Sequence, residues 1–180
     1  MKVLTGEVEG ALVEICAALG GVLLANGGLA TDVQAGADSV VDCIRDGRAA
    51  ERFGRMVAAM GGPVRFVEDW SRFLPEATVI REVAAPVSGY VGAIDGEALG
   101  LAVVHLGGGR VVETDTIDPA VGITQVARLG TEVAKGQPLA VVHATRPDAA
   151  DKAARAVRAA MEVSLARPET LPDLIQERIG

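Results

Sequence analysis

The sequence has few aromatic side chains: three Phe, one Tyr and one Trp in 180 residues. Alanine, valine and leucine must therefore fill most of the core, because large rings supply little of the buried area. Hydrophobic residues make up 49% of the chain, and the mean hydropathy is +0.32. This balance indicates that another segment or subunit covers some of the apolar surface.

Basic residues are also scarce, with 17 Lys and Arg against 24 Asp and Glu and a net charge of -7. Nucleic-acid binding depends on clustered Lys and Arg that neutralise phosphates. No basic stripe is visible in the sequence, so we expect no nucleic-acid partner.

Long apolar runs are missing as well. The longest, residues 15–25, is too short to cross a bilayer, which takes ~20 residues. The opening MKVLTGEVEG has one lysine followed by acids, unlike a secretory leader. We expect no membrane partner and a cytoplasmic location.

Cysteine and histidine occur twice each. Cys16 and Cys43 lie in apolar helical patterns without CxxC spacing, which predicts two buried free thiols. His105 lies in an apolar helical pattern and His143 ends the segment LAVVHA. Structural roles are favoured for both over ligation, and we expect no metal site.

The first part of the chain predicts three helices, over residues 8–26, from residue 31, and over residues 48–60. Gly20 and Gly21 should weaken the first helix. The second opens with a capping box in which Thr31 is the cap and Gln34 its partner. The expected inward residues are, by helix, Leu12, Ile15, Leu19, Val22 and Leu23; Val33, Ala37, Val40, Val41 and Ile44; and Phe53, Met56, Val57 and Met60.

A change of composition near Pro75 predicts two domains, residues 1–75 and 76–180. The segment PEATVIREVAAPVSGYVGAI is rich in β-branched residues and suits short strands. Asp95 can cap a helix over residues 96–106, with a hairpin turn at Asp95-Gly96 as the alternative. Strands are expected again from Arg110, with a hairpin turn at Lys135-Gly136.

A last helix is predicted from Pro147 to just before Pro168. Its expected apolar face carries Ala154, Val157, Met161 and Leu165. Its charged face, with Lys152, Arg155, Arg158 and Glu162, is interpreted as solvated surface, and a binding role is the alternative.

The run LGGGR at residues 106–110 raises the question of a phosphate cradle. Such a cradle needs glycines between a strand and the N-terminus of a helix. Here the glycines follow a helix and meet its negative carbonyl end, so a helix exit is favoured. Arg110 remains an alternative anion ligand.

Three carboxylates, Glu113, Asp115 and Asp118, follow closely, and Asp118 before Pro119 is typical of a turn. No GxSxG, HExxH or Walker motif is present. The segment LGTEVAKGQPLAVV resembles the hairpin of biotinyl and lipoyl carrier domains, but Lys135 in Ala-Lys-Gly lacks the setting of a modified lysine.

Four segments in order, GRAAERFGRMVAAMGGPVRFVED, SGYVGAIDGEALGLAVVHLGGGR, DTIDPAVGITQVARLG and VAKGQPLAVVHA, resemble the C-terminal part of thymidine phosphorylases, in the pyrimidine-nucleoside phosphorylase family. The resemblance implies an α+β chain. A helical segment that packs on a larger α/β domain precedes an α/β-hammerhead, barrel-sandwich-like module at about residues 77–146 and a C-terminal helix.

The family cleaves thymidine with phosphate, which is a co-substrate, to thymine and 2-deoxyribose 1-phosphate. Its phosphate loop, Lys-His-Ser/Thr-Gly-Gly, and its base-binding Arg, Ser and Lys set are not found here. The resemblance therefore assigns no catalytic, cofactor-binding or metal residue and no cofactor. It assigns fold roles to Gly107, Gly108 and Gly109 (a turn), to Ser88-Gly89 and Gly136 (hairpin positions), and to His143 (a strand end).

Three functions remain open at this point. The chain is a C-terminal phosphorylase fragment that is inactive alone, one subunit of a split phosphorylase, or a free-standing binding module. The expected partner is a missing N-terminal lobe, or a second copy bound through the N-terminal helices.

Overall fold

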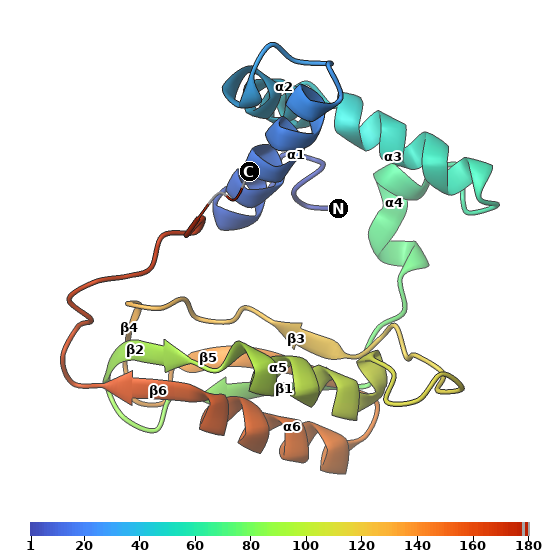
Figure 1. The fold of residues 1–180 in the computed structure, drawn as a ribbon. Helices are drawn as coiled ribbons and strands as arrows, with labels where there is room; N and C mark the ends of the chain where they lie inside the picture. The colour runs from blue at the N-terminus through green and yellow to red at the C-terminus, as the bar shows by residue number, and fades with distance from the viewer. Residues whose placement is uncertain (178, 180) are drawn as a thin grey trace. The chain divides into compact units, whose positions relative to one another are not determined.

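A computed structural model describes residues 1–177 and 179. The chain forms two compact units: Met1–Phe73 together with the described residues from Pro172 onward, and Leu74–Leu171. Helices come first and a mixed helix and strand unit follows (Figure 1), which confirms the α+β class. In the described part of the chain, no helix is both long enough and apolar enough to span a membrane.

The first unit contains four helices, α1 (Ala11–Asn26), α2 (Val33–Arg45), α3 (Arg48–Ala59) and α4 (Phe66–Phe73). The three predicted helices are confirmed, whereas α4 was not predicted. A kink at Asp69 interrupts α4. Its Phe66 ring lies 6.1 Å from both the Phe53 and the Phe73 rings, so three of the chain's few aromatic residues gather here.

Helices α1 and α2 meet through small residues rather than through the predicted apolar face. A Cβ atom on Gly21 would lie 2.5 Å from the Val33 carbonyl oxygen, and one on Gly36 would lie 2.7 Å from the Gly21 oxygen. The predicted face is wrong in part: Leu12, Leu19 and Leu23 are exposed. The glycines let the two backbones approach, and this contact selects which side of α1 is buried.

The cap of α2 also differs from the prediction. Asp32 is the cap, and its Oδ1 accepts a hydrogen bond from the Ala35 backbone N–H at 2.8 Å. The Thr31 hydroxyl donates to Asp32, and the Gln34 amide donates to Asp38, so neither closes the predicted box. The Ala35 N–H bond lowers the pKa of Asp32, because it stabilises the carboxylate.

In α3, only part of the predicted inward face packs. Phe53 and Val57 are half-buried. Met56 and Met60 are 48% and 80% exposed, which contradicts their inward assignment.

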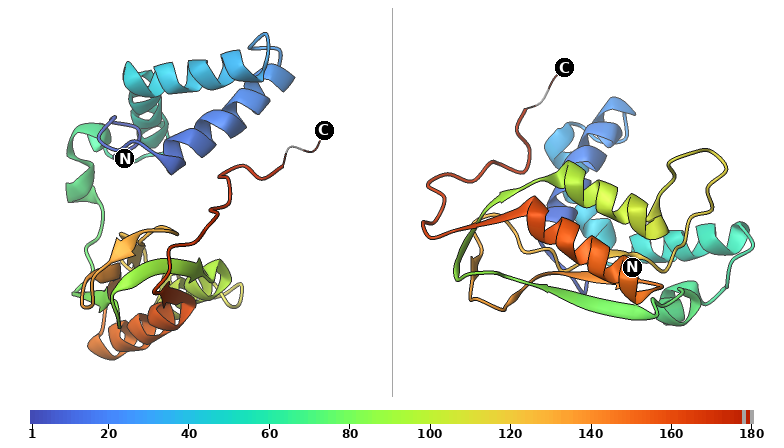
Figure 2. Two further views of the ribbon diagram at one scale, coloured as in Figure 1. Left: turned by 90° about the vertical axis from the view of Figure 1, so that its left-hand side faces the viewer. Right: turned by 90° about the horizontal axis from the view of Figure 1, so that it is seen from below.

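The second unit contains two three-stranded antiparallel sheets (Figures 1 and 2). The strand orders are β1-β5-β3 and β4-β2-β6. The elements are β1 (Val79–Ala84), β2 (Gly89–Ile94), α5 (Gly96–Val103), η1 (Val104–Gly108), β3 (Gly122–Thr124), β4 (Glu132–Val133), β5 (Pro138–Ala144), α6 (Pro147–Ala160) and β6 (Met161–Ser164). Within the described residues the two sheets do not close into a barrel.

Asp95 caps α5 as predicted, since its Oδ1 accepts a hydrogen bond from the Ala98 N–H at 2.9 Å. The alternative hairpin turn at Asp95-Gly96 is therefore wrong. The strand expected from Arg110 is also wrong, because the next strand begins only at Gly122.

The predicted hairpin at Lys135-Gly136 is a turn between two sheets. Gly136 has a φ of 89°, and the Gln137 N–H donates to the Ala134 carbonyl. However, β4 pairs with β2 while β5 pairs with β1 and β3. The flanking strands are thus not partners, and the turn carries the chain from one sheet to the other.

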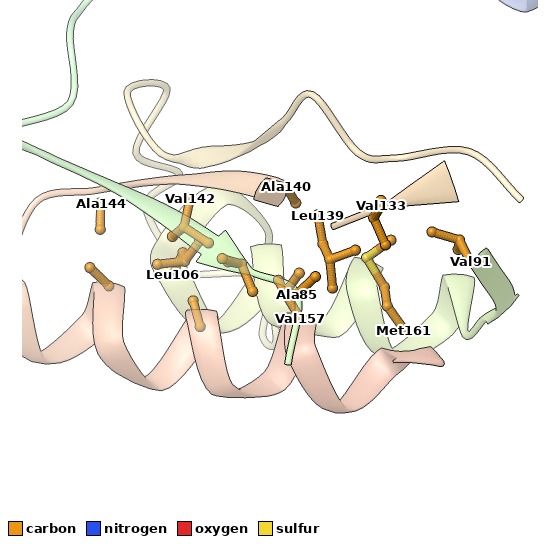
Figure 3. Packing of buried hydrophobic residues seen from close by; sticks show 13 residues of the cluster. Ala85, Val91, Leu106, Val133, Leu139, Ala140, Val142, Ala144, Val157 and Met161 are labelled. Carbon is orange, nitrogen blue, oxygen red and sulfur yellow. The ribbon is translucent and has the colours of Figure 1, made fainter. Parts of the chain in front are cut away.

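The core of this unit lies between α6, α5 and the strands (Figure 3). Small and medium side chains fill it, as the low aromatic content predicts. Its fully buried members, with 0% exposure, are Val83, Val91, Leu139, Ala140, Val142, Ala144, Ala150 and Val157.

The last predicted helix ends earlier than expected. Helix α6 stops at Ala160, and residues from Met161 form β6, which pairs with β2. Met161 is buried from a strand, and Leu165 is 87% exposed, so their helical assignment is wrong. The described residues beyond Ser164 contain no helix, so α6 is the last helix in the described part of the chain.

Candidate functional site

The three glycines after α5 form a helix exit, as predicted. Gly107 has a φ of 99°, a conformation that favours glycine. A Cβ atom on Gly108 would lie 2.8 Å from Val103 Cγ1, and one on Gly109 would lie 2.7 Å from Val104 Cγ2. The chain therefore leaves the helix by folding closely against the last helical residues.

A carboxylate of the chain binds the backbone that follows these glycines. Asp115 Oδ2 accepts hydrogen bonds from the N–H groups of Val111 at 2.9 Å and Val112 at 3.0 Å. These bonds stabilise the charged form and lower the pKa of Asp115. The two N–H groups are engaged and do not form a phosphate cradle, while the neighbouring Arg110 is exposed.

Asp118 forms the turn that its position before Pro119 predicts. Its Oδ1 accepts a hydrogen bond from the Ala120 N–H at 2.9 Å. Its own N–H donates to the Gly107 carbonyl at 2.8 Å. Two of the three clustered carboxylates thus hold loop backbone, while Glu113 is exposed.

The two histidines differ in setting. The hydroxyl of Thr124 lies 2.8 Å from Nε2 of His143, so His143 has a hydrogen-bond partner on the neighbouring strand β3. His105 is exposed in η1, which differs from its expected structural role in an apolar face. Among the described residues, no group of three or more His, Cys, Asp or Glu side chains is placed to hold a metal ion.

The two cysteines are both free, as predicted, but they are not buried. Cys16 is exposed and Cys43 is half-buried. The glycine contact between α1 and α2 turns a different side of α1 inward, which leaves Cys16 outside.

The predicted hairpin residues lie where two segments meet. The Ser88 hydroxyl accepts a hydrogen bond from the Lys135 N–H at 2.8 Å. Gly89 begins β2, and a Cβ atom there would overlap the Ser164 carbonyl oxygen. Ser88 therefore connects the segment before β2 to the turn at Lys135-Gly136, and Gly89 allows β6 to lie close to β2. The Lys135 side chain is exposed.

The segment from β2 to β6 also matches a known family. Residues 90–164 match the model of the pyrimidine nucleoside phosphorylase C-terminal domain. The chain contains a pyrimidine nucleoside phosphorylase C-terminal domain. The glycine exit, the Asp115 loop, the turn at Gly136 and α6 all lie inside the match. Strand β1 precedes the matched residues but pairs with β5 from Val79 to Ala84, so it completes a sheet of the phosphorylase domain.

The charged face of α6 has two different surroundings in the phosphorylase domain. Arg155 and Arg158 line a cavity beside β1, where Arg81 forms a salt bridge of 2.5 Å with Asp151. Lys152 instead lines a cavity that faces α5. Lys152, Arg155 and Arg158 are exposed, as the solvated-surface interpretation predicts, whereas Glu162 lies in β6 and is not part of the α6 face.

His105 and Lys152, which the sequence analysis did not connect, both line the cavity that faces α5. Arg146, which the sequence analysis did not consider, lines the same cavity. Arg146 directly precedes Pro147 at the start of α6. Pro147 predicts the start of α6 from the sequence alone. The presence of Arg146 and His105 at one cavity, in contrast, depends on the packing of α6 on α5. The expectation that the chain holds no catalytic, cofactor-binding or metal-binding residue stays a prediction.

Proposed function

We propose that this chain is the C-terminal part of a thymidine phosphorylase, which converts thymidine and phosphate to thymine and 2-deoxyribose 1-phosphate. The match of residues 90–164 to the pyrimidine nucleoside phosphorylase C-terminal domain carries this proposal. The preceding segment GRAAERFGRMVAAMGGPVRFVED, which resembles the same family, extends it to the helical unit.

The chain on its own is proposed to be inactive. Phosphorolysis requires the phosphate nucleophile and the leaving pyrimidine to be positioned and stabilised together. At the glycine exit, the hydrogen bonds to Asp115 already engage the Val111 and Val112 N–H groups. In this proposal an N-terminal lobe supplies the groups that bind phosphate and base.

The helical unit is the proposed docking surface for that lobe. Leu12, Leu19 and Leu23 of α1 are 60%, 61% and 73% exposed, which is unusual for one face of a helix in an isolated domain. A groove of about 700 Å³ also lies between α1, α2 and the N-terminal residues. A lobe on a separate chain, and a second copy of this chain, are the alternative occupants.

The test is thymidine phosphorolysis by the purified chain, alone and mixed with an N-terminal phosphorylase lobe. We expect no turnover alone, and a complex with activity after mixing. Turnover by the chain alone, free of contaminating enzyme, contradicts the proposal. A monodisperse monomer that binds no lobe would instead support a free-standing binding module.

A further inference from the structure

The cavity between α6 and the α5–η1 segment gathers basic side chains from two separate parts of the sequence. It has a volume of about 210 Å³, and His105, Arg146 and Lys152 line it together with Asp148. These four polar residues are exposed and form the rim. The other lining residues are apolar and mostly small: Ala102, Leu106, Ala149, Ala153 and Ala156.

Buried residues form the base of this cavity, since Ala102, Leu106 and Ala153 are 3%, 8% and 5% exposed. Alanine side chains from both helices leave the space open, because a methyl group fills little volume. The cavity is smaller than the ~300–1,000 Å³ of sites for drug-sized ligands. It therefore fits a compact molecule with a small apolar body.

We propose that this cavity binds a phosphate monoester, with the phosphate at the cationic rim and the apolar body against the alanines. Lysine and arginine side chains are hydrogen-bond donors without acceptors, and the guanidinium of Arg146 can bind two phosphate oxygens at once. The imidazole of His105 adds a donor from the opposite helix. This site involves no residue of the glycine exit and does not rest on the proposed function.

One carboxylate opposes the anion. Asp148 Oδ1 lies 3.5 Å from Arg146 Nε, and the two side chains are 79% and 74% exposed. Such an exposed pair contributes little, so Arg146 can exchange Asp148 for a phosphate at small cost. Lys152 forms no salt bridge within the described part of the chain and is available to the ligand.

The proposal is tested by calorimetric titration of the 180-residue chain with phenyl phosphate at constant ionic strength. We expect saturable binding that Lys152→Glu weakens at least about tenfold, because a charge beside a doubly charged anion is reversed. Lys135→Glu is the matched control: Lys135 is exposed in the same unit but does not line the cavity. It should leave the affinity unchanged, whereas Asp148→Asn should strengthen binding.

Two related probes define the ligand. Inorganic phosphate should bind more weakly, because it lacks the apolar body, and benzoate should bind more weakly, because it carries one charge. Absence of saturable binding, or an equal effect of Lys152→Glu and Lys135→Glu, overturns the proposal. Equal affinity for benzoate overturns the assignment to phosphate. Since no nucleoside or lobe is present, these outcomes are independent of the phosphorolysis test.

Discussion

Gly21 and Gly36 meet backbone to backbone where α1 crosses α2. A Cβ atom on Gly36 would lie 2.9 Å from the Gly21 Cα atom and 2.7 Å from its carbonyl oxygen. Both glycines are buried. The helical unit thus depends on a close contact that no residue with a side chain can make unchanged.

Gly36→Ala should lower the free energy of unfolding of the helical unit by about 1–3 kcal/mol, the usual cost of overpacking. Gly100→Ala is the control, because Gly100 lies in α5 and a Cβ atom there would meet nothing within 4 Å. That change should stabilise the chain by about 0.5–1 kcal/mol through helix propensity. Urea unfolding followed by circular dichroism measures both, and a Gly36→Ala protein as stable as wild type would contradict the contact.

Leu139→Ala should lower the free energy of unfolding of the second unit by about 2–5 kcal/mol. The Leu139 side chain is fully buried, so its truncation leaves a cavity. Leu165→Ala removes the same atoms from a residue that is 87% exposed and should change stability little. Thermal unfolding of the two variants compares them directly. Similar losses of stability in the two variants would contradict the burial of the Leu139 side chain.

Asp115→Asn should loosen the loop after the glycine exit, because the amide replaces the charged acceptor of the Val111 and Val112 N–H groups. Hydrogen exchange at these two amides should become faster. Glu113→Gln, a change at an exposed neighbour, should leave their exchange unaltered. Unchanged protection in Asp115→Asn would rule out the carboxylate as the loop anchor.

Amide protection in the same loop should decrease as the pH is lowered. The pKa of Asp115 is lowered in the fold, so its contribution is present above the unfolded pKa of about 3.9 and is lost as the pH falls through the lower folded value. Protection of the Val111 and Val112 amides, corrected for intrinsic exchange, should therefore decrease below about pH 4. Asp115→Asn should abolish that step.

Asp32→Ala should destabilise α2 more than Thr31→Ala, because the Asp32 carboxylate accepts the Ala35 N–H bond. Its lowered pKa means that this stabilisation is present near neutral pH and lost in acid. Asp32→Asn should retain most of the cap. Helix content and unfolding midpoints at pH 7 rank the three variants. A larger loss of stability in Thr31→Ala than in Asp32→Ala would contradict the Asp32 cap and support the predicted capping box.

Local chemistry in the sequence determined where several elements begin or turn. Asp95 caps α5, Pro147 starts α6, Gly107 takes a left-handed conformation within η1 and Gly136 turns the chain. Each signal acts over a few residues, through one hydrogen bond or one backbone angle, so it does not need the rest of the fold. The scarcity of aromatic residues likewise determined a core of alanine, valine and leucine.

Tertiary structure decided the features that depend on distant partners. Met161 continues a helical pattern, yet it lies in a strand because β2 offers hydrogen bonds to it. Lys135-Gly136 looks like a hairpin, yet its flanking strands pair with β2 and with β1. The buried face of α1 depends on how closely the α1 and α2 backbones approach each other. The packing of α6 on α5 likewise brings His105 and Lys152 to one cavity. Packing, rather than the periodicity of the sequence, sets both arrangements.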